Sequence, residues 1–439
     1  MWTHSWGLQY SDNEILASKE IPECMNRLAV LITTCMAAML LASCGSGSSE
    51  SRTLLVPESY PTIQDAIDKA KPGDLVLISP GVYRESVKVN QEQIVIRGTD
   101  RNDVVLDGGD ELINGFEISA DSVAIENLTV KSYRQNGIVF SGALREMEGE
   151  YGIYGSESNT LDGYRVSYVT SYNNGLYGIY AFASKNGLIE HSYASGHPDS
   201  GLYVGQCRPC NVVIRASVAE NNAIGYYGTN ASDNVWVVES VFRGNRLGIT
   251  PNSQDAEMLS PQKGATVAAN LVVDNDNPDA PVIPEGFFGG GIVVGGGLSN
   301  LVTKNVVLGH SWAGIAIMSI SDVLPSDNQI TDNESLDNGT DLVFIGAPKD
   351  VLGNCFKGNN FSTASPQTIE QLLPCASASQ LAETVQYNPL LAPPGPDYRK
   401  ILAPPRQQPM PNALNAPVQI PRGEPVYPTL SALVVPANG

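Results

Sequence analysis

A short phrase, in which glycine (once aspartate) precedes a bulky apolar residue, recurs along the middle of the chain. The apolar members are, in order, Ile138, Ile179, Leu202, Tyr226, Ile249, Ile292, Ile315 and Leu342. Successive members lie 41, 23, 24, 23, 43, 23 and 27 residues apart, which gives a base period of 23 to 24 residues. The two longest gaps predict insertions near 141–160 and 251–290.

Each repeat also carries a second apolar run, such as Val212–Ile214 or Val235–Val238. A unit this small cannot bury its own apolar face, so neighbouring repeats must stack around a shared core. The 42 glycines and 29 prolines favour tight turns over long helices. The pattern predicts an all-β, single-stranded parallel β-helix, a solenoid, over residues 53–376, with eight to ten coils between residues 75 and 360.

Both ends of the solenoid have predicted caps. Residues 61–70 read as a short helix with Thr62 as N-cap and Asp65 reaching back, suited to plugging the open core. Residues 355–375 hold a polar loop and a helical stretch at 368–373 that would close the other end. Residues 377–439 are rich in proline, which predicts a tail without a packed core, either extended or laid along the solenoid.

The start of the chain resembles a targeting segment. Residues 28–43 are sixteen nearly uncharged residues that follow Arg27 and end in Leu41-Ala42-Ser43-Cys44, a sequence similar to the bacterial lipobox. We expect residues 1–43 to be a signal segment, with Met25 as the alternative start, and residues 44–52 to be a tether lipid-anchored through the sulfur of Cys44. The protein would then be exported and attached to the cell envelope, at the outer membrane if the host is Gram-negative.

Four further cysteines remain in the mature chain: Cys207, Cys210, Cys355 and Cys375. An even number in an exported protein predicts two disulfides. Three pairings are open, and closeness in sequence favours Cys207 with Cys210 and Cys355 with Cys375. A zinc site of four thiolates is the less favoured alternative.

The stretch TIQDAIDKAKPGDLVLISPGVYRESV, which starts at Thr62, resembles the entry cap of secreted proteins of the pectin-lyase-like superfamily. Residues 177–207, YGIYAFASKNGLIEHSYASGHPDSGLYVGQC, resemble exported bacterial β-helix repeat proteins, many of which carry lipoprotein signals. The resemblance covers roughly residues 50–375. It implies a right-handed solenoid with an N-terminal capping helix, and it implies export, but no single activity.

Catalytic motifs of more distant relatives are incomplete. The polygalacturonase motifs are absent, and Arg208-Pro209-Cys210 lacks the second arginine of the pectate-lyase element. His197-Pro198-Asp199 only faintly resembles the Asp-Pro-His-Asp of alginate epimerases. No catalytic role is therefore carried over from these families.

The chain has 46 acidic and 26 basic residues and a net charge of −20. This balance excludes nucleic acid as a partner, because phosphate binding needs a basic footprint. The membrane would be reached only through the lipid anchor.

Strand alternation predicts three outward tyrosines. If Ile179, Leu202 and Tyr226 point inward, Tyr180, Tyr203 and Tyr227 point outward from coils spaced by about 4.8 Å. We expect them to share one exposed face that binds a glycan, so that Tyr203→Ala changes stability by no more than about 0.5 kcal/mol. The alternative is that the three tyrosine side chains only cover the sheet and bind no ligand.

An active site is a third interpretation of the same region. There His197 or Tyr203 would remove a proton next to a carboxylate, with Asp199 in the adjacent turn and a cation or Arg208 neutralising the developing charge. The competing interpretation places Asn174, His197, Asn221 and Asn245 in a ladder of turn residues, and we favour that ladder.

Calcium is the one cofactor for which the sequence offers candidates. Asp274, Asp276 and Asp279 could supply oxygen ligands, but a solvated turn is favoured because the loop lacks the glycine and final glutamate of an EF-hand.

Three functions thus remain. The first is an envelope lipoprotein that binds a polysaccharide or another envelope component. The others are a polysaccharide lyase or C5-epimerase, and a purely structural surface solenoid.

Overall fold

The computed structural model describes residues 51–146, 159–284 and 286–437. The predicted signal segment and Cys44 lie outside the described residues. Residue Arg52 of the predicted tether is already part of the fold, because its guanidinium pairs with Asp74. Within the described ranges, no helix is both long enough and apolar enough to cross a lipid bilayer.

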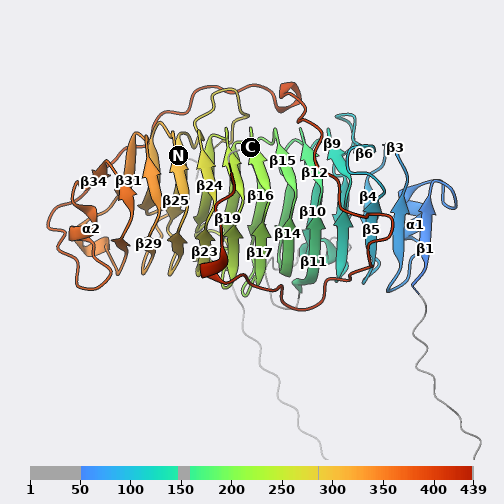
Figure 1. The fold of residues 1–439 in the computed structure, drawn as a ribbon, viewed down its shortest axis with the longest axis horizontal. Coiled ribbons are helices and arrows are strands. Elements are labelled where there is room, and N and C mark those ends of the chain that lie inside the picture. The colour runs from blue at the N-terminus through green and yellow to red at the C-terminus, as the bar shows by residue number, and fades with distance from the viewer. Residues whose placement is uncertain (1–50, 147–158, 285, 438–439) are drawn as a thin grey trace, which may run out of the picture. The chain divides into compact units, whose positions relative to one another are not determined.

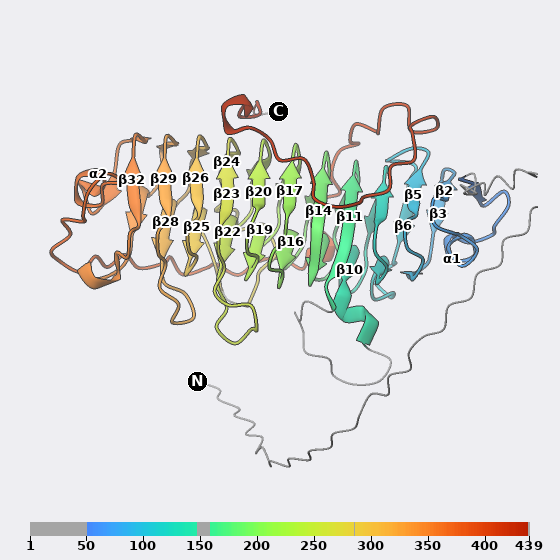
Figure 2. The same cartoon turned by 90° about the horizontal axis from the view of Figure 1, so that it is seen from below.

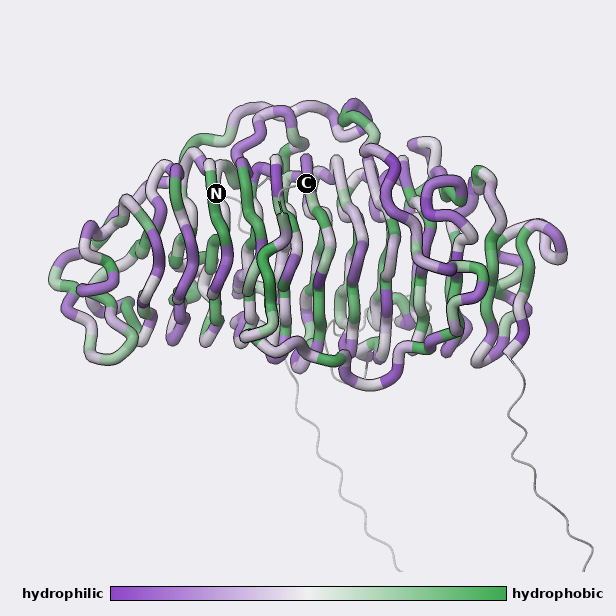
Figure 3. The backbone as a smooth tube through the Cα atoms, viewed as in Figure 1, coloured by the Kyte–Doolittle hydropathy of each residue, from purple (hydrophilic) through white to green (hydrophobic). Residues whose placement is uncertain are grey.

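The chain winds into a right-handed parallel β-helix with three sheets, which confirms the predicted fold class (Figure 1). From β2 onward, each coil contributes one strand to sheet A, then one to sheet B, then one to sheet C, whereas β1 is followed by a helix and contributes to sheet A alone. Hydrophobic and hydrophilic segments alternate along the coils (Figure 3).

Sheet A consists of β1 (Thr53–Val56), β2 (Leu75–Ile78), β5 (Val95–Gly98), β8 (Val123–Glu126), β11 (Leu161–Ser167), β14 (Ser184–Glu190), β17 (Val212–Arg215), β20 (Val235–Val238), β23 (Ala265–Ala268), β26 (Leu301–Thr303), β29 (Gln329–Thr331) and β32 (Cys355–Lys357). Sheet B consists of β3 (Gly81–Tyr83), β6 (Val104–Asp107), β9 (Thr129–Lys131), β12 (Thr170–Tyr172), β15 (Tyr193–Ser195), β18 (Val218–Glu220), β21 (Val241–Arg243), β24 (Leu271–Val273), β27 (Val306–Leu308), β30 (Glu334–Leu336) and β33 (Asn360–Phe361). Sheet C consists of β4 (Val87–Val89), β7 (Phe116–Ile118), β10 (Ile138–Ser141), β13 (Ile179–Phe182), β16 (Ser200–Gly205), β19 (Ile224–Thr229), β22 (Leu247–Asn252), β25 (Gly290–Gly295), β28 (Ala313–Met318), β31 (Thr340–Phe344) and β34 (Ala364–Ser365).

The expected number of coils was too low. Sheet A has 12 strands, and all but β1 fall between residues 75 and 360. The repeated phrase does not indicate the early coils clearly. Strands β4 and β7 are only three residues long, and Val87 of β4 follows serine rather than glycine.

The interior follows the predicted alternation. Ile179, Leu202, Tyr226 and Ile249 all belong to one continuous cluster of buried side chains. The strand register stacks them on one another, since Ile179 pairs with Leu202 and Leu202 pairs with Tyr226. Outward positions of sheet C are therefore the residues between them.

The first predicted insertion is residues 142–160, between β10 and β11, and it begins with the 3-10 helix η1 (Gly142–Glu146). The second is two separate loops, at 253–264 and 274–289, because β23 and β24 interrupt it. η1 and the loop after β22 project from the same side of the solenoid (Figure 2). These two loops leave sheet C at the same edge.

Short helices close both ends. In α1 (Ile63–Ile67) the Thr62 hydroxyl accepts from the Asp65 amide at 3.0 Å, as an N-cap should. The Glu85 carboxylate, rather than a side chain of the helix itself, accepts from the amides of Ile63 and Gln64 at 3.1 Å each. At the other end, α2 (Ile369–Leu372) is shorter than predicted and buries Ile369.

The disulfides join Cys207 to Cys210 and Cys355 to Cys375. This is the pairing that sequence proximity favoured. The second bridge ties β32 to the residues that follow α2, so it holds the cap against the last coil.

The proline-rich tail lies along the solenoid, which is one of its two expected arrangements. It contains the 3-10 turns η4 (Tyr398–Lys400) and η5 (Leu430–Ala432), with η3 (Pro348–Asp350) preceding it in the chain. Figures 1 and 2 show it running back along the solenoid and then returning. Leu433 joins a buried cluster with Val213 and Val238 of sheet A, so the segment is an extended strap that packs on the outer face of that sheet.

A tyrosine cluster on the outer face of sheet C

The three predicted tyrosines lie side by side on successive strands. Tyr180 pairs with Tyr203, and Tyr203 pairs with Tyr227. The rings of Tyr180 and Tyr203 stack with centroids 4.7 Å apart, and those of Tyr203 and Tyr227 meet edge to face at 6.0 Å. Since none of the three belongs to the interior cluster, their side chains point outward.

The expectation of a shared exposed face is wrong for Tyr203. Only 4% of this residue is exposed, whereas Tyr180 and Tyr227 are half-buried. Its ring lies over Gly205 of the same strand, where an added Cβ would come 2.3 Å from the phenol oxygen. The absence of a side chain at Gly205 lets the ring lie flat, and its neighbours then cover it.

Two more aromatic residues complete what we call the tyrosine cluster: Tyr177, Tyr180, Phe182, Tyr203 and Tyr227. The Tyr177 ring lies 4.4 Å from that of Tyr180 and 5.0 Å from that of Tyr203, and the Phe182 ring stacks on Tyr180 at 5.7 Å. Neither residue occupies the position that repeats with the 23 to 24 residue period, so the period alone does not indicate them. Phe182 could have been found, since it lies two residues beyond Tyr180 and strand alternation keeps it on the same face.

Two carboxylates border the cluster. The Tyr177 hydroxyl bonds to Asp199, and burial together with this carboxylate raises the pKa of Tyr177. Glu257, from the loop after β22, accepts from the side-chain amides of Gln206 and Asn230. Burial raises the pKa of Glu257 above its ordinary value, although both hydrogen bonds act in the opposite direction.

His197 lies in the interior, as the ladder interpretation predicted. Its Nε2 is 3.2 Å from the Asn174 amide nitrogen and its Nδ1 is 2.7 Å from Asn222 Oδ1. The ladder continues through Asn245, Asn275, His310 and Asn338. Burial lowers the pKa of His197 to about 4. A fully buried, neutral imidazole with both nitrogens bonded cannot take a proton from a surface ligand.

The predicted ladder residue Asn221 is replaced by its neighbour Asn222. Asn221 has a φ of 55°, and this left-handed residue turns the chain, while Asn222 points inward. The sequence shows two consecutive asparagines at this turn, and the repeat period alone could not tell which one faces the core.

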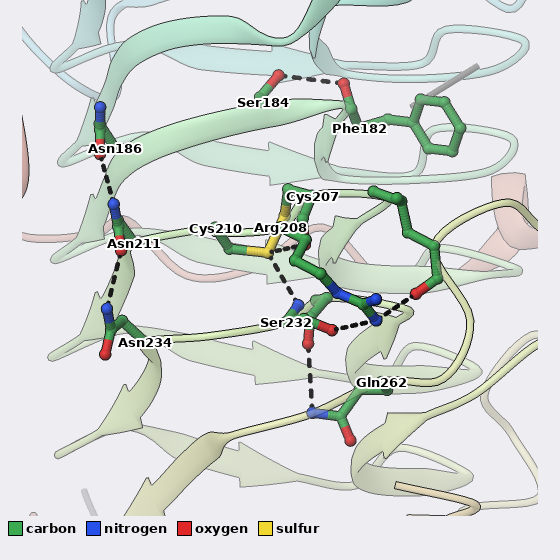
Figure 4. The surroundings of a disulfide bond; sticks show 12 residues. Phe182, Ser184, Asn186, Cys207, Arg208, Cys210, Asn211, Ser232, Asn234 and Gln262 are labelled. Atoms are coloured by element: carbon green, nitrogen blue, oxygen red, sulfur yellow. Dashed lines mark hydrogen bonds between the residues drawn. A yellow bond between two sulfur atoms is a disulfide. The ribbon is translucent and has the colours of Figure 1, made fainter. Parts of the chain in front are cut away.

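Arg208 does not face the tyrosine cluster. Its guanidinium donates to the Leu259 carbonyl at 2.7 Å and to the carbonyl of Pro261, and it also reaches Ser232 (Figure 4). It therefore holds the loop after β22 against the disulfide-bonded turn. This role occupies the group that was considered for neutralising charge in an active site.

The calcium candidates do not converge. Asp274 and Asp279 are exposed, and Asn275 between them turns inward to join the ladder. Among the described residues, no group of three or more His, Cys, Asp or Glu side chains is arranged to hold a metal ion.

The outer face of sheet C is closed beyond the tyrosine cluster. Val293, Ala316 and Val343 point outward in the same column but are buried, in a cluster with Ile283 of the 274–289 loop and Tyr387 of the tail. Tyr387 is fixed by its hydroxyl, which donates to the Trp312 carbonyl at 2.8 Å. The half-exposed aromatic rings thus lie where this cover ends.

The family model for the right handed beta helix region matches residues 114–271. Among curated proteins, none matches the sequence significantly. Similar solved structures include the mannuronan C-5 epimerase A-module of Azotobacter vinelandii, with 13% identity over 69% of this chain and 91% of that one and a TM-score of 0.45. A pectate lyase has 15% identity over 76% and 83%, with a TM-score of 0.46. A lacto-N-biosidase from Eubacterium ramulus has 14% identity over 68% and 64%, with a TM-score of 0.43. The chain therefore contains a right-handed β-helix region.

Proposed function

We propose that the protein binds a glycan on the outer face of sheet C, through Tyr180 and Tyr227. The observation that carries this proposal is the tyrosine cluster, in which a buried Tyr203 supports two half-exposed rings. Aromatic faces with a polar tip suit sugars, which present apolar CH faces and hydroxyl edges. Because the rings come from successive coils, an extended glycan can contact more than one of them.

The proposal concerns binding rather than catalysis. Of the groups considered for proton transfer and charge neutralisation, His197 is enclosed in the ladder, Tyr203 is buried and Arg208 is bonded to backbone carbonyls. A lyase or C5-epimerase mechanism would need other groups. The structural-solenoid alternative corresponds to rings that cover the sheet without binding.

Export and a lipid anchor at Cys44 belong to the same proposal. The two disulfides support export, because such bonds persist in oxidising compartments. Replacing Cys44 by alanine should leave an unprocessed precursor that takes up no fatty-acid label. Normal labelling of that variant would contradict the anchor.

The binding proposal is tested with the full-length protein on a glycan array, with and without calcium, followed by titration of any ligand found. Tyr180→Ala and Tyr227→Ala should each weaken binding about fivefold or more, by analogy with bases stacked on aromatic side chains, which contribute about 1 to 3 kcal/mol each. The matched control is Tyr168→Ala. Tyr168 is another half-buried tyrosine, stacked on His191 at a corner between sheets A and B.

Unchanged affinity in both test variants would show that ligand binds elsewhere. An array without any ligand would favour the structural alternative. Chain cleavage or new unsaturated uronate ends in a bound polysaccharide would instead establish an enzyme.

A further inference from the structure

The charged side chains closest to the tyrosine cluster are acidic. Glu257 lies near enough to Tyr203 that its charge contributes to the raised pKa of that phenol, after burial and the neighbouring tyrosines. Asp199 is bonded to Tyr177 on the other side. Along the outward column of sheet C, Tyr180 is preceded by Val139 and then by Glu117. A ligand on these rings therefore meets negative charge from several directions.

Three arginines of this region are engaged elsewhere. Arg208 is bonded to carbonyls of the loop after β22. Arg246 donates to the carbonyls of Ala280 and Pro393. Arg145 of η1 pairs with Asp121 and donates to the Ser119 carbonyl.

The lysine nearest in sequence to the cluster, Lys185, lies three residues after Phe182 and pairs with Asp162 at 3.5 Å. The exposed Lys263 lies six residues from Glu257 in the loop after β22. Lys88 occupies the same outward column, beside Glu117 in the strand register. It lies three strands before Tyr180, which is about 14 Å at the usual strand spacing.

We infer that the ligand of the tyrosine cluster is a neutral glycan, built from hexose or N-acetylhexosamine units, rather than a polyuronate. This inference rests on the proposed binding function. A polyuronate carries a carboxylate on every sugar, and an acidic site without a cation to pair with them repels the chain. A neutral glycan is not repelled by these acidic side chains, so they do not lower its affinity.

Glu257 has a specific part in the selection. Within the described residues both hydrogen bonds to its side chain end on Oε2, so Oε1 can accept from a sugar hydroxyl. The same oxygen opposes a sugar carboxylate. Glu257 is thus a positioning group for hydroxyls and a barrier to uronates.

The test compares polymers with the same backbone linkage and sugar configuration that differ in the charged or neutral group at C6. One pair is polygalacturonate and its fully methyl-esterified form, and the other is polymannuronate and β-1,4-mannan. Oligosaccharides of equal length are titrated into the full-length protein at low and high salt, with a chelator and with calcium. For a pair of polymers that the protein binds, the neutral polymer should bind at least about tenfold more tightly than the charged one. This preference should decrease at high salt.

Glu257→Gln keeps the acceptor for Gln206 and Asn230 but removes the charge, so it should raise affinity for the uronate member and narrow the preference. Asp255→Asn is the control, because Asp255 is an exposed residue of the same loop; it should leave the preference nearly unchanged.

Equal or tighter binding of the uronate member, alone or bridged by calcium, would overturn the inference. If that binding were still lost in Tyr180→Ala, the proposed function would stand without it. If no glycan of either kind bound, on these pairs or on the array, both would be overturned.

Discussion

Arg246 and Pro393 lie 147 residues apart in sequence and are joined by two hydrogen bonds of 2.7 and 2.8 Å, from the guanidinium to the proline carbonyl. Arg97 and Arg101 do the same for other parts of the tail, donating to the carbonyls of Ala416 and Gln408. The tail has many prolines, which lack amide donors but retain carbonyl acceptors. Buried arginines supply the missing donors.

Arg246→Met should therefore loosen the tail. The methionine keeps much of the apolar stem but leaves buried carbonyls without a donor, at a cost of about 1 to 3 kcal/mol. Limited proteolysis near residue 393 should accelerate. Arg406→Met is the control, since Arg406 is largely exposed in its pair with Asp103 and such pairs contribute about 0 to 1 kcal/mol. Equal cleavage of both variants would contradict the role of Arg246.

Tyr203→Ala should destabilise the protein by about 3 kcal/mol, because it empties a buried aromatic site. This replaces the expectation of about 0.5 kcal/mol or less that the sequence alone suggested. Tyr203→Phe keeps the ring and should lower the free energy of unfolding by much less. Urea denaturation measures both, and a loss below about 1 kcal/mol in the alanine variant would show that the ring is not buried.

Glu126→Gln should be costly for a different reason. Glu126 pairs with both Arg97 and Arg165 in the buried layer beneath the tail. Removing its charge leaves two buried guanidinium groups without a counter-ion, and breaking such a network costs about 3 to 5 kcal/mol. Asp121→Asn, at the exposed pair with Arg145, is the control and should change the free energy of unfolding by less than about 1 kcal/mol. A similar decrease in the free energy of unfolding in both variants would contradict the role of Glu126 as the buried counter-ion.

The ladder histidines predict a pH dependence. Burial lowers the pKa of His197 and of His310 from 6.5 to about 4. The unfolded chain therefore binds more protons than the folded one between these values, so stability falls as the pH drops from about 6.5 to about 4. The loss is on the order of 3 kcal/mol for each histidine.

Replacing both histidines by asparagine, the usual residue of the ladder, should flatten this part of the stability curve. The measurement is urea denaturation at several pH values across the window. A double variant with the same slope as the parent would show that other groups cause the acid sensitivity.

The sequence predicted those features that repeat. The period placed the inward residues Ile179 and Leu202, and alternation then placed Tyr180 and Tyr203 on the opposite face. Exposure of Tyr203 could not be predicted in this way, because the ring is buried by Tyr177 and by its fit over Gly205, neither of which belongs to the repeated phrase.

Long-range contacts were also beyond the pattern. Nothing in the spacing of Arg246 indicates that a segment 147 residues later will cover it. The proline content indicated a tail without a packed core, because proline weakens regular structure. It could not decide whether that tail stays extended or lies along the solenoid, because this depends on the donors that the neighbouring surface supplies. The choice between Asn221 and Asn222 likewise depended on one left-handed residue.

The ladder that contains His197 has a direction. Each member donates toward the C-terminal end and accepts from the preceding member, from Asn174 to Asn338 and finally to Asp341. Because every interior rung presents the same donor and acceptor, a coil could be duplicated or deleted without reversing any neighbour. We therefore expect homologous solenoids to differ in length by whole coils, with the carboxylate terminus of the row retained.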